Sequence, residues 1–163
     1  MKKNISKLIA VYPGSFDPPT LGHVDIIARS SRIFPRVIVA ITDNPNKRPF
    51  FTVEERKKML LQSTKNFKNV EIDSFEGLLV DYLKKKNAEI IIRGLRAVSD
   101  FEYEFQLALM NRRLNSKIET VFILPDESYT YLSSSLVKEI HKLGGNIGGL
   151  VPKITEQFLK KKL

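Results

Sequence analysis

Five short apolar segments recur along the chain, and amphipathic stretches long enough for a helix separate them. The apolar segments, which we expect to be strands, cover residues 8–12, 37–42, 70–73, 89–92 and 120–124. Several consist almost wholly of apolar residues, as strands buried on both faces do. Strands that alternate with helices are typical of a parallel sheet with crossover helices. The pattern therefore predicts an α/β fold, with a doubly wound parallel five-stranded sheet and helices on both faces.

Helix starts are marked by hydroxyl residues that can cap them. Thr52 with Glu55 has the spacing of a capping box, in which a hydroxyl and a carboxylate bond the first backbone N–H groups of a helix. Ser99 with Glu102 has the same spacing. Further helices are expected from Thr20 or Gly22 to Phe34, from Leu78 and Leu79, from Ser133 to about Gly144, and from Pro152. His141 falls on the helix after Ser133, and we expect it at the surface.

Length and composition place these elements in one domain. A chain of 163 residues fits a single domain, 1–163, with a C-terminal helix over about 152–162 packed on it. No apolar run approaches the roughly 18 residues of a membrane span and no signal-peptide pattern follows the first residues, so we expect a soluble cytoplasmic protein without a membrane partner. The chain has no cysteine, which excludes disulfides, thiolate metal sites and cysteine nucleophiles.

The net charge of +9 is compatible with a nucleic-acid partner, a phosphorylated small molecule or a lysine-rich surface. Much of it lies in two lysine runs, residues 84–86 and 160–162, at expected helix ends, where cations favour the negative end of the helix dipole. The other basic residues of interest are few and stand beside glycine or proline. This distribution favours anionic small molecules over nucleic acid.

The residues with distinctive chemistry form four clusters, each after an expected strand. In open parallel sheets, ligands bind beyond the carboxyl ends of the strands, where strand order reverses. In the first cluster, residues 12–23, Gly14 lets the backbone approach a ligand closely. The following helix start places His23 beside N–H groups that suit a phosphate. The alternative is that His23 is only a polar residue near a helix start.

The segments GSFDP (residues 14–18) and TLGH (residues 20–23) together resemble the (T/H)xGH signature of the nucleotidyltransferase superfamily, which includes the class I aminoacyl-tRNA synthetases. The resemblance implies a Rossmann-like fold, in which His23 contacts the phosphates of ATP and stabilises the transition state. It further implies that Ser15 and Phe16 contact ATP and that Ser15 also touches the second substrate. For Asp17 we expect hydrogen bonds to the backbone of its own loop rather than a part in catalysis.

The second and third clusters supply cations. Lys47 and Arg48 lie on a proline-stiffened loop, where they can reach a bound phosphate or form an ordinary solvated turn. Arg93 and Arg96 leave a buried strand, where guanidinium groups lose hydration unless anions meet them. A bound phosphate would compensate the charge of the two arginines. Ion pairs with Asp100 or Glu102 are the alternative.

Residues 93–104 resemble the RGLRAxxDFEYE segment of phosphopantetheine adenylyltransferases. By that resemblance Arg93 meets the phosphate side of the acceptor, while Arg96 binds ATP and acts in catalysis. The further nucleotide contacts that it implies are Gly94, Leu95 and Glu104. It also makes Lys47 a catalytic and substrate-binding residue. A pantetheine contact is implied near Leu79, which from the pattern alone is a core residue.

The fourth cluster follows the fifth strand and ends in three consecutive serines. A helix start needs one capping hydroxyl, so three hydroxyls with nearby N–H groups suggest a cradle for a triphosphate; capping alone is the alternative. The segment resembles the family's ISSS motif, with Leu132 in place of isoleucine. The ATP contacts that this implies are Tyr129, Thr130, Tyr131, Leu132, Ser133, Ser134 and Ser135.

The resemblance implies a nucleotidyltransferase that moves the adenylyl group of ATP to 4'-phosphopantetheine, giving dephospho-coenzyme A and pyrophosphate in the penultimate step of coenzyme A biosynthesis. A phosphate acceptor is already an anion, so in-line attack needs positioning and charge stabilisation but no covalent intermediate. Mg²⁺ would arrive on the ATP phosphates, without protein ligands. A homohexamer is also implied. The alternatives are nicotinamide mononucleotide or glycerol phosphate as acceptor, or an RNA-binding module.

Overall fold

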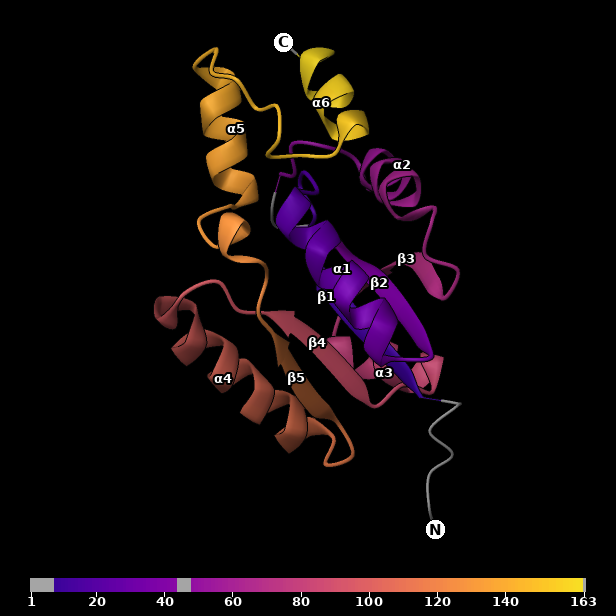
Figure 1. Ribbon diagram of the computed structural model, residues 1–163. Coiled ribbons are helices and arrows are strands. Elements are labelled where there is room, and N and C mark those ends of the chain that lie inside the picture. Colours follow the sequence, from indigo (N-terminus) through magenta and orange to yellow (C-terminus); the bar gives the residue numbers. More distant parts are fainter. Residues whose placement is uncertain (1–7, 44–47, 163) are drawn as a thin grey trace.

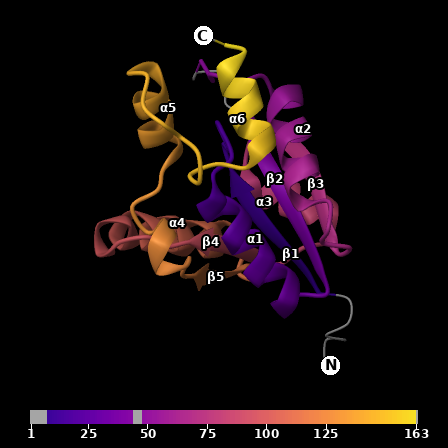
Figure 2. The ribbon, with the colours of Figure 1, turned by 45° about the horizontal axis from the view of Figure 1, so that its top comes forward.

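The computed structural model describes residues 8–43 and 48–162 as a parallel sheet with helices on both faces (Figure 1 and Figure 2). The strands are β1 (Ile9–Gly14), β2 (Arg36–Asp43), β3 (Val70–Glu76), β4 (Ile90–Gly94) and β5 (Glu119–Ile123). Their order is β3-β2-β1-β4-β5, and every neighbouring pair is parallel. The chain order reverses between β1 and β4, which is the switch point of a doubly wound sheet. The predicted fold class is confirmed.

The helices divide between the two faces of the sheet and its rim. They are α1 (Leu21–Ile33), α2 (Val53–Thr64), α3 (Leu79–Lys86), α4 (Val98–Leu114), α5 (Ser134–Lys142) and α6 (Lys153–Lys160), with a short 3-10 helix, η2 (Glu127–Tyr129). Figure 1 shows α5 and α6 beyond the carboxyl ends of the strands. Within residues 8–43 and 48–162, no helix is both long and apolar enough to cross a bilayer.

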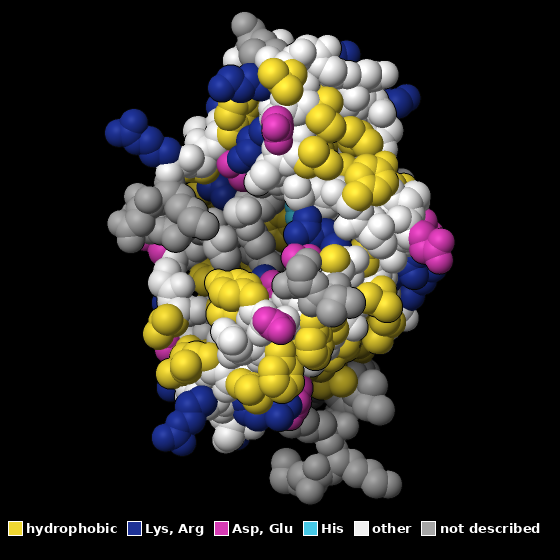
Figure 3. All heavy atoms as spheres, turned by 90° about the vertical axis from the view of Figure 1, so that its left-hand side faces the viewer, with side chains coloured by type: hydrophobic (Ala, Val, Ile, Leu, Met, Phe, Trp, Pro, Cys, Tyr) yellow, Lys and Arg dark blue, Asp and Glu magenta, His cyan; other side chains and the backbone are white. Residues whose placement is uncertain are grey.

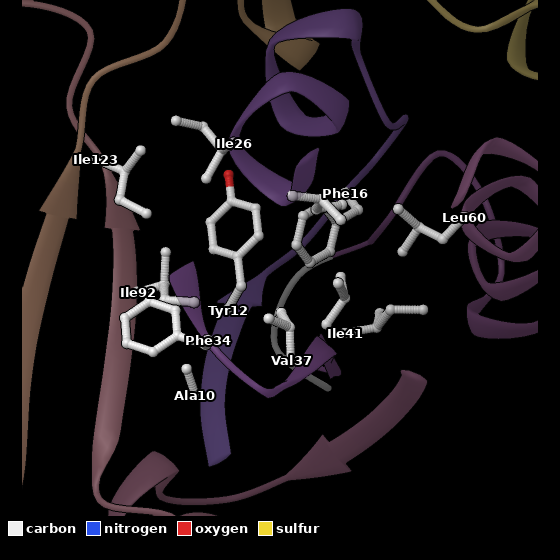
Figure 4. Packing of buried hydrophobic residues seen from close by; sticks show 12 residues of the cluster. Ala10, Tyr12, Phe16, Ile26, Phe34, Val37, Ile41, Leu60, Ile92 and Ile123 are labelled. Carbon is white, nitrogen blue, oxygen red and sulfur yellow. The ribbon is translucent and has the colours of Figure 1, made fainter. Parts of the chain in front are cut away.

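Neighbouring residues of the central strands build two separate cores, because they point to opposite faces of the sheet. Tyr12 of β1 belongs to the core under α1 and α2, together with Ile26 and Leu60 from those helices (Figure 4). Val11, the residue before it, belongs to the core under α3, together with Leu83. β1 is therefore buried on both faces, as its unbroken apolar pattern predicts.

Four of the five strands end later than their apolar residues predict, β2 by one residue and β3 by three. β1 ends at Gly14 and β4 at Gly94, each two residues beyond the expected end. Gly14 still pairs with Ile41, and Gly94 with Ile123. Sheet pairing uses the backbone, so glycine and arginine can continue a strand that the hydrophobic pattern ends. As a result, the strands themselves carry these residues to the rim of the sheet.

Of the two predicted capping boxes, one is present. The Thr52 hydroxyl accepts the Glu55 N–H at 3.2 Å, and the Glu55 carboxylate accepts the Thr52 N–H at 2.9 Å. The box predicted at Ser99 and Glu102 is wrong, since α4 begins before Ser99, with Ala97 as its N-cap and no side-chain capping bond. A capping hydroxyl must precede the helix, whereas Ser99 lies inside its first turn.

The last two helices, α5 and α6, share a third apolar cluster at the rim, which includes Val137 and Leu159. His141 of α5 is only 9% exposed, and its Nε2 lies 3.0 Å from the carbonyl oxygen of Leu159. The surface position predicted for His141 is therefore wrong. The reason is tertiary: α6 covers the face of α5 that carries this histidine, which the pattern of α5 alone cannot reveal.

Candidate active site

A cavity of about 450 Å³ lies at the switch point, between the carboxyl ends of β1 and β4. This volume is in the range of small-molecule sites. Figure 3 shows a hollow near the middle of this face, with a histidine at its bottom and basic side chains beside it. The wall includes His23, Arg96 and Ser134, which come from three segments far apart in the sequence. The structure thus brings the first, third and fourth clusters together at one place.

Phe16 fixes the shape of the loop between β1 and α1. Its side chain is 1% exposed, its φ of 47° lies in the left-handed region, and its ring is edge-on to Tyr12 and His23, with centroids 5.3 and 5.1 Å away. A Cβ atom at Gly14 would lie 2.9 Å from that ring, so this position needs glycine. The buried Phe16 ring therefore packs beneath the loop on the core side. Ser15 beside it is exposed at the cavity.

His23 takes part in an unusual capping box. The Thr20 hydroxyl accepts the His23 N–H at 3.3 Å, and the Thr20 N–H donates to His23 Nδ1 at 3.0 Å. Because Nδ1 is an acceptor, the proton of the neutral ring is on Nε2. Burial, and to a smaller extent the charge of Arg96, lowers the pKa of His23 from 6.5 to about 4. At neutral pH the cavity therefore contains a neutral imidazole that donates through Nε2.

Arg93 is held by a two-point ion pair. Its Nε and Nη2 atoms lie 2.6 and 2.5 Å from the two carboxylate oxygens of Glu104, and Nη1 donates to the carbonyl of Pro13 at 3.1 Å. Burial disfavours the charge of Arg93, but the hydrogen bonds and charge of Glu104 outweigh it and raise the pKa. Both side chains line the cavity. The ion pair that the sequence offered as an alternative exists, but with Glu104 and not with Asp100 or Glu102.

Arg96 connects the end of β4 to the loop before α5. Its Nε lies 3.1 Å from an Asp100 carboxylate oxygen, and Nη1 donates to the carbonyl of Leu132 at 3.1 Å. Here the predicted ion pair with Asp100 is present. The Arg96 side chain is still 41% exposed and lines the cavity, so its contacts leave it within reach of a ligand.

The three serines have different surroundings. Ser133 caps α5 by accepting the Leu136 N–H at 3.1 Å, and Ser134 Oγ donates to the carbonyl of Pro18 at 2.7 Å. Both line the cavity. Ser135 is exposed and lies outside the cavity wall. The capping alternative therefore holds for Ser133, while Ser134 ties α5 to the loop after β1.

Two helix N-termini present backbone donors to the cavity. Gly22 in the first turn of α1 and Ser134 in the first turn of α5 both line it. Within the part of the chain that the structure describes, neither N–H has a hydrogen-bond partner. Unpaired N–H groups at the positive end of a helix dipole are a natural seat for phosphate.

The remaining predicted nucleotide contacts divide into two groups. Gly94, Tyr129 and Leu132 line the cavity. Thr130 and Tyr131 lie outside the cavity wall, and so does Leu95, whose N–H donates to the carbonyl of Ile123 at 3.1 Å. Contacts of these residues with ATP stay predictions.

The predicted acceptor contacts lie partly beyond this cavity. Lys47 falls outside the described residues, and Arg48 after it is exposed. Leu79 is partly buried against the core under α3, as its pattern indicates, whereas its neighbour Leu78 is 58% exposed at a second hollow beside the end of β3. A pantetheine contact at Leu79 stays a prediction.

Asp17 has partners far away in sequence. Its two carboxylate oxygens accept the N–H groups of Phe50 and Phe51, each at 2.8 Å, and Lys138 of α5 lies 3.2 Å away. The prediction that Asp17 bonds its own loop is wrong, because the segment before α2 passes close enough to use both oxygens. Asp17 therefore joins three segments beside the site.

Sequence reasoning missed several residues of the cavity wall, among them Tyr12, Ile26 and Tyr103. Tyr12 and Ile26 have the apolar pattern of core residues, and they are indeed buried. Burial raises the pKa of the Tyr12 hydroxyl far above its usual value, so the phenol stays neutral. Position could have pointed to the two tyrosines, since Tyr12 is the first residue of the first cluster and Tyr103 lies one residue before Glu104.

The chain also matches known proteins in sequence. A family model described as Cytidylyltransferase-like matches residues 11–140. A phosphopantetheine adenylyltransferase of Dictyoglomus turgidum is 60% identical over 153 residues, which cover 94% of this chain and 96% of that protein. One of Alkaliphilus metalliredigens is 54% identical over 154 residues, which cover 94% and 98%.

A solved structure shares the fold at much lower identity. The crystal structure of a putative nicotinate-nucleotide adenylyltransferase from Vibrio parahaemolyticus superimposes with a TM-score of 0.72 at 19% identity, over 96% of this chain and 94% of that one. At this identity the likeness shows the fold alone. The sequence matches are far closer and span nearly the whole chain. The chain therefore belongs to the cytidylyltransferase-like family and, within it, to the phosphopantetheine adenylyltransferases.

Proposed function

We propose that this chain transfers the adenylyl group of ATP to the phosphate of 4'-phosphopantetheine, which gives dephospho-coenzyme A and pyrophosphate. The observation that carries the proposal is the meeting of His23, Arg96 and two helix N-termini at one cavity of a phosphopantetheine adenylyltransferase. Such a cavity suits a polyphosphate, because each of these groups donates hydrogen bonds to anionic oxygen. The reaction is the penultimate step of coenzyme A biosynthesis, and we expect it to run in the cytoplasm.

The chemistry needs no nucleophile from the protein. The acceptor's phosphate oxygen attacks the α-phosphorus of ATP, the bond to the β-phosphate oxygen breaks, and pyrophosphate leaves with the electron pair. His23 Nε2 donates a hydrogen bond to the phosphate charge that grows in the transition state, and does so as a neutral group. The N–H groups of Gly22 and Ser134 supplement it. Positioning and charge stabilisation are sufficient for phosphoryl-type transfer of this kind.

The two arginines have separate roles in this proposal. Arg96 binds the phosphates of ATP, since it is exposed at the cavity and attached to the loop before α5. Arg93, held rigidly by Glu104, faces the acceptor's phosphate. The other acceptor contacts that we propose are Ser15, Lys47 and Leu79.

We propose Mg²⁺ as the cofactor. In the described ranges, no group of three or more His, Cys, Asp or Glu side chains is placed to hold a metal ion. Mg²⁺ prefers phosphate oxygens and water in nucleotide sites, and there it neutralises charge on the leaving group. The residues of the cavity that would face the ion's phosphate ligands are Arg96 and the serine end of α5.

The acceptor is tested by pyrophosphate release with ATP, Mg²⁺ and one of three acceptors: 4'-phosphopantetheine, nicotinamide mononucleotide or glycerol phosphate. We expect turnover with 4'-phosphopantetheine only. Turnover with a different acceptor alone would contradict the proposal, and so would tight, steeply salt-dependent RNA binding without pyrophosphate release. His23→Gln is the matched variant, because glutamine can keep the capping bond to Thr20. It should lower kcat about 100-fold or more.

We also propose that the chain assembles as a homohexamer. α4 presents six large apolar side chains to the surface, each at least 44% exposed: Phe101, Tyr103, Phe105, Leu109, Met110 and Leu114. Figure 3 shows apolar side chains gathered on the half of this face where α4 lies. Exposed apolar side chains in this number are typical of an interface between subunits.

A further inference from the structure

Arg56 of α2 is the largest fully buried side chain among the described residues, with 2% of its surface exposed. It donates to three backbone carbonyls: Nη1 to Ser15 at 2.9 Å and to Thr42 at 3.3 Å, and Nε to Thr52 at 3.3 Å. These carbonyls belong to the loop after β1, the end of β2 and the N-cap of α2. One guanidinium therefore joins three separate segments at the rim of the sheet.

A cation at this place is unfavourable for the fold in two respects. A buried guanidinium loses its hydration, and the loss must be offset by the hydrogen bonds that it makes. Arg56 also lies near the N-terminus of α2, where the helix dipole disfavours positive charge. The hydrogen bonds to the three carbonyls are among the contacts that offset this cost.

The loop that Arg56 holds is the one that forms the cavity wall. Ser15 exposes its side chain at the cavity, while its carbonyl is bound by Arg56 from the other side. Two residues further on, Asp17 accepts the N–H groups of Phe50 and Phe51, just before α2. The loop is thus bound to the start of α2 at two residues, Ser15 and Asp17. Of these, Ser15, which Arg56 binds, lines the cavity.

We propose that Arg56 is a positioning residue for the reaction: by binding the carbonyl of Ser15 together with those of Thr42 and Thr52, it fixes the cavity-lining loop where the two substrates meet. This inference rests on the proposed function. It differs from a purely stabilising role in one respect, because a looser loop lowers the rate even in a fully folded protein. Misplacement of reacting groups by about 1 Å can lower a rate about 100-fold.

The test compares Arg56→Lys with Leu83→Ala. Lysine keeps the charge, but its ammonium is a point donor that cannot span three carbonyls as a guanidinium does. Leu83 is fully buried in the core under α3, on the other face of the sheet, so its truncation lowers stability away from the loop. For each protein kcat and the KM of both substrates are measured by pyrophosphate release, and the unfolding midpoint is measured in urea.

We expect kcat of R56K to fall about 10- to 100-fold at a temperature where circular dichroism shows it folded, with a smaller change in the KM of ATP. L83A should keep the wild-type kcat although its unfolding midpoint falls as far or further. An R56K protein that loses stability but keeps kcat overturns the proposal. If R56K does not fold, Arg56→Gln replaces it, since glutamine can still donate to one carbonyl without burying a charge.

Hydrogen exchange gives a second readout that needs no acceptor. The backbone amides of residues 14–17 should exchange faster in R56K than in the wild type and in L83A, because the loop has lost its tie. Equal exchange in all three proteins overturns the positioning role. If wild-type protein releases no pyrophosphate with 4'-phosphopantetheine, the proposed function fails, and the exchange result still decides what Arg56 does.

Discussion

The imidazole of His23 is fixed in one tautomer by the start of its own helix. In an ordinary capping box a glutamate or glutamine accepts the N-cap N–H; here Nδ1 of His23 accepts it from Thr20. That bond orients the ring and leaves Nε2 as the donor toward the cavity. Burial then keeps the ring neutral, with a pKa of about 4. The same contacts that begin α1 therefore set the protonation state of the residue proposed for catalysis.

The titration of His23 tests this arrangement directly. In protein without ligand, long-range proton–nitrogen NMR should show the Nε2–H tautomer and a midpoint near 4, well below the ordinary 6.5. His23→Gln assigns the signals, because the chain has only two histidines. Arg96→Met should raise the midpoint, since the charge of Arg96 contributes to the shift. A midpoint near 6.5 or an Nδ1–H tautomer would contradict the capping geometry.

The same pKa shift makes stability depend on pH. The unfolded imidazole takes up a proton near pH 6.5, whereas the folded one does so only near pH 4. The unfolded state thus binds more protons between these values, and the contribution of His23 to the free energy of unfolding should fall as the pH drops from about 6.5 to 4. Urea unfolding at several pH values measures this slope. In His23→Gln the slope over this range should become shallower; an unchanged slope would exclude His23 as its source.

Glu104 gives a second single-residue prediction. Its carboxylate is 12% exposed and pairs with Arg93 through two hydrogen bonds. Glu104→Gln removes the charge and one of the two acceptors, which should lower the free energy of unfolding by about 2 kcal/mol. Glu102→Gln, an exposed change two residues earlier in α4, is the control and should stay within about 0.5 kcal/mol of wild type. If both variants changed the free energy of unfolding equally, the ion pair of Arg93 and Glu104 would contribute nothing to stability.

Residues differ in how far the sequence could predict their surroundings. His23, Arg96 and Ser134 lie in segments that follow β1, β4 and β5. Parallel strands bring their carboxyl ends together, so the meeting of these residues at one cavity follows from the pattern. The pairing of Arg93 with Glu104 depends on the direction in which α4 leaves β4. The burial of His141 depends on where α6 packs. Such contacts are tertiary, and no local spacing specifies them.

Among the elements, α5 is held to the site by polar side chains near its start as well as by the apolar cluster that it shares with α6. Ser134 donates to the carbonyl of Pro18, and Lys138, one turn later, pairs with Asp17. Since Asp17 also binds the segment before α2, this carboxylate connects the start of α5, the loop after β1 and the entry to α2. The helix end that we propose for phosphate binding thus owes part of its position to polar contacts with the loop after β1.

Asparagine at position 17 tests that connection. Asp17→Asn leaves one acceptor oxygen for two backbone N–H groups, so either the Phe50 or the Phe51 N–H loses its partner. A buried donor without a partner costs roughly 1–3 kcal/mol, and we expect a loss of about 2 kcal/mol in urea unfolding. Lys138→Met should cost less, because both N–H bonds to Asp17 remain. Lys142→Met, on the exposed end of α5, is the control. If it lowered the free energy of unfolding as much as Asp17→Asn does, the contacts of Asp17 would have no special role in stability.

Sequence patterns predicted the elements better than their ends. The five strands and the helix starts at Thr20 and Thr52 follow from apolar runs and capping residues. β1 and β4 exceed their predicted ends, because Gly14 and Gly94 are held by ladder pairing that hydrophobicity does not report. α4 begins without a side-chain cap, so its start at Val98 has no signal of the expected kind. The errors concentrate at the rim, where chemistry rather than burial selects the residues.

For the molecule as a whole, the switch point between β1 and β4 decides where substrates can meet. Strand order reverses there, and the loops after both strands diverge to leave a cavity. The fold class, and with it this location, was predictable from the alternation of strands and helices. The apolar exterior of α4 could not be predicted in the same way, because a helix that is apolar on more than one side does not show the 3.6-residue hydrophobic period of a helix with one buried face. Exposed apolar residues of this kind are what the proposed subunit interface would cover.

Self-association through α4 is therefore the prediction that concerns the whole molecule. Leu109 of α4 and Leu61 of α2 are leucines in helices with nearly equal exposure, 50% and 51%. Leu109→Glu should weaken the assembly, because a charge buried between subunits loses its hydration, whereas Leu61→Glu should leave it intact. Light scattering after size exclusion should give six copies of the 18.7 kDa chain for wild type and L61E and a smaller species for L109E. Monomeric wild type, or equal masses for both variants, would exclude α4 as the interface.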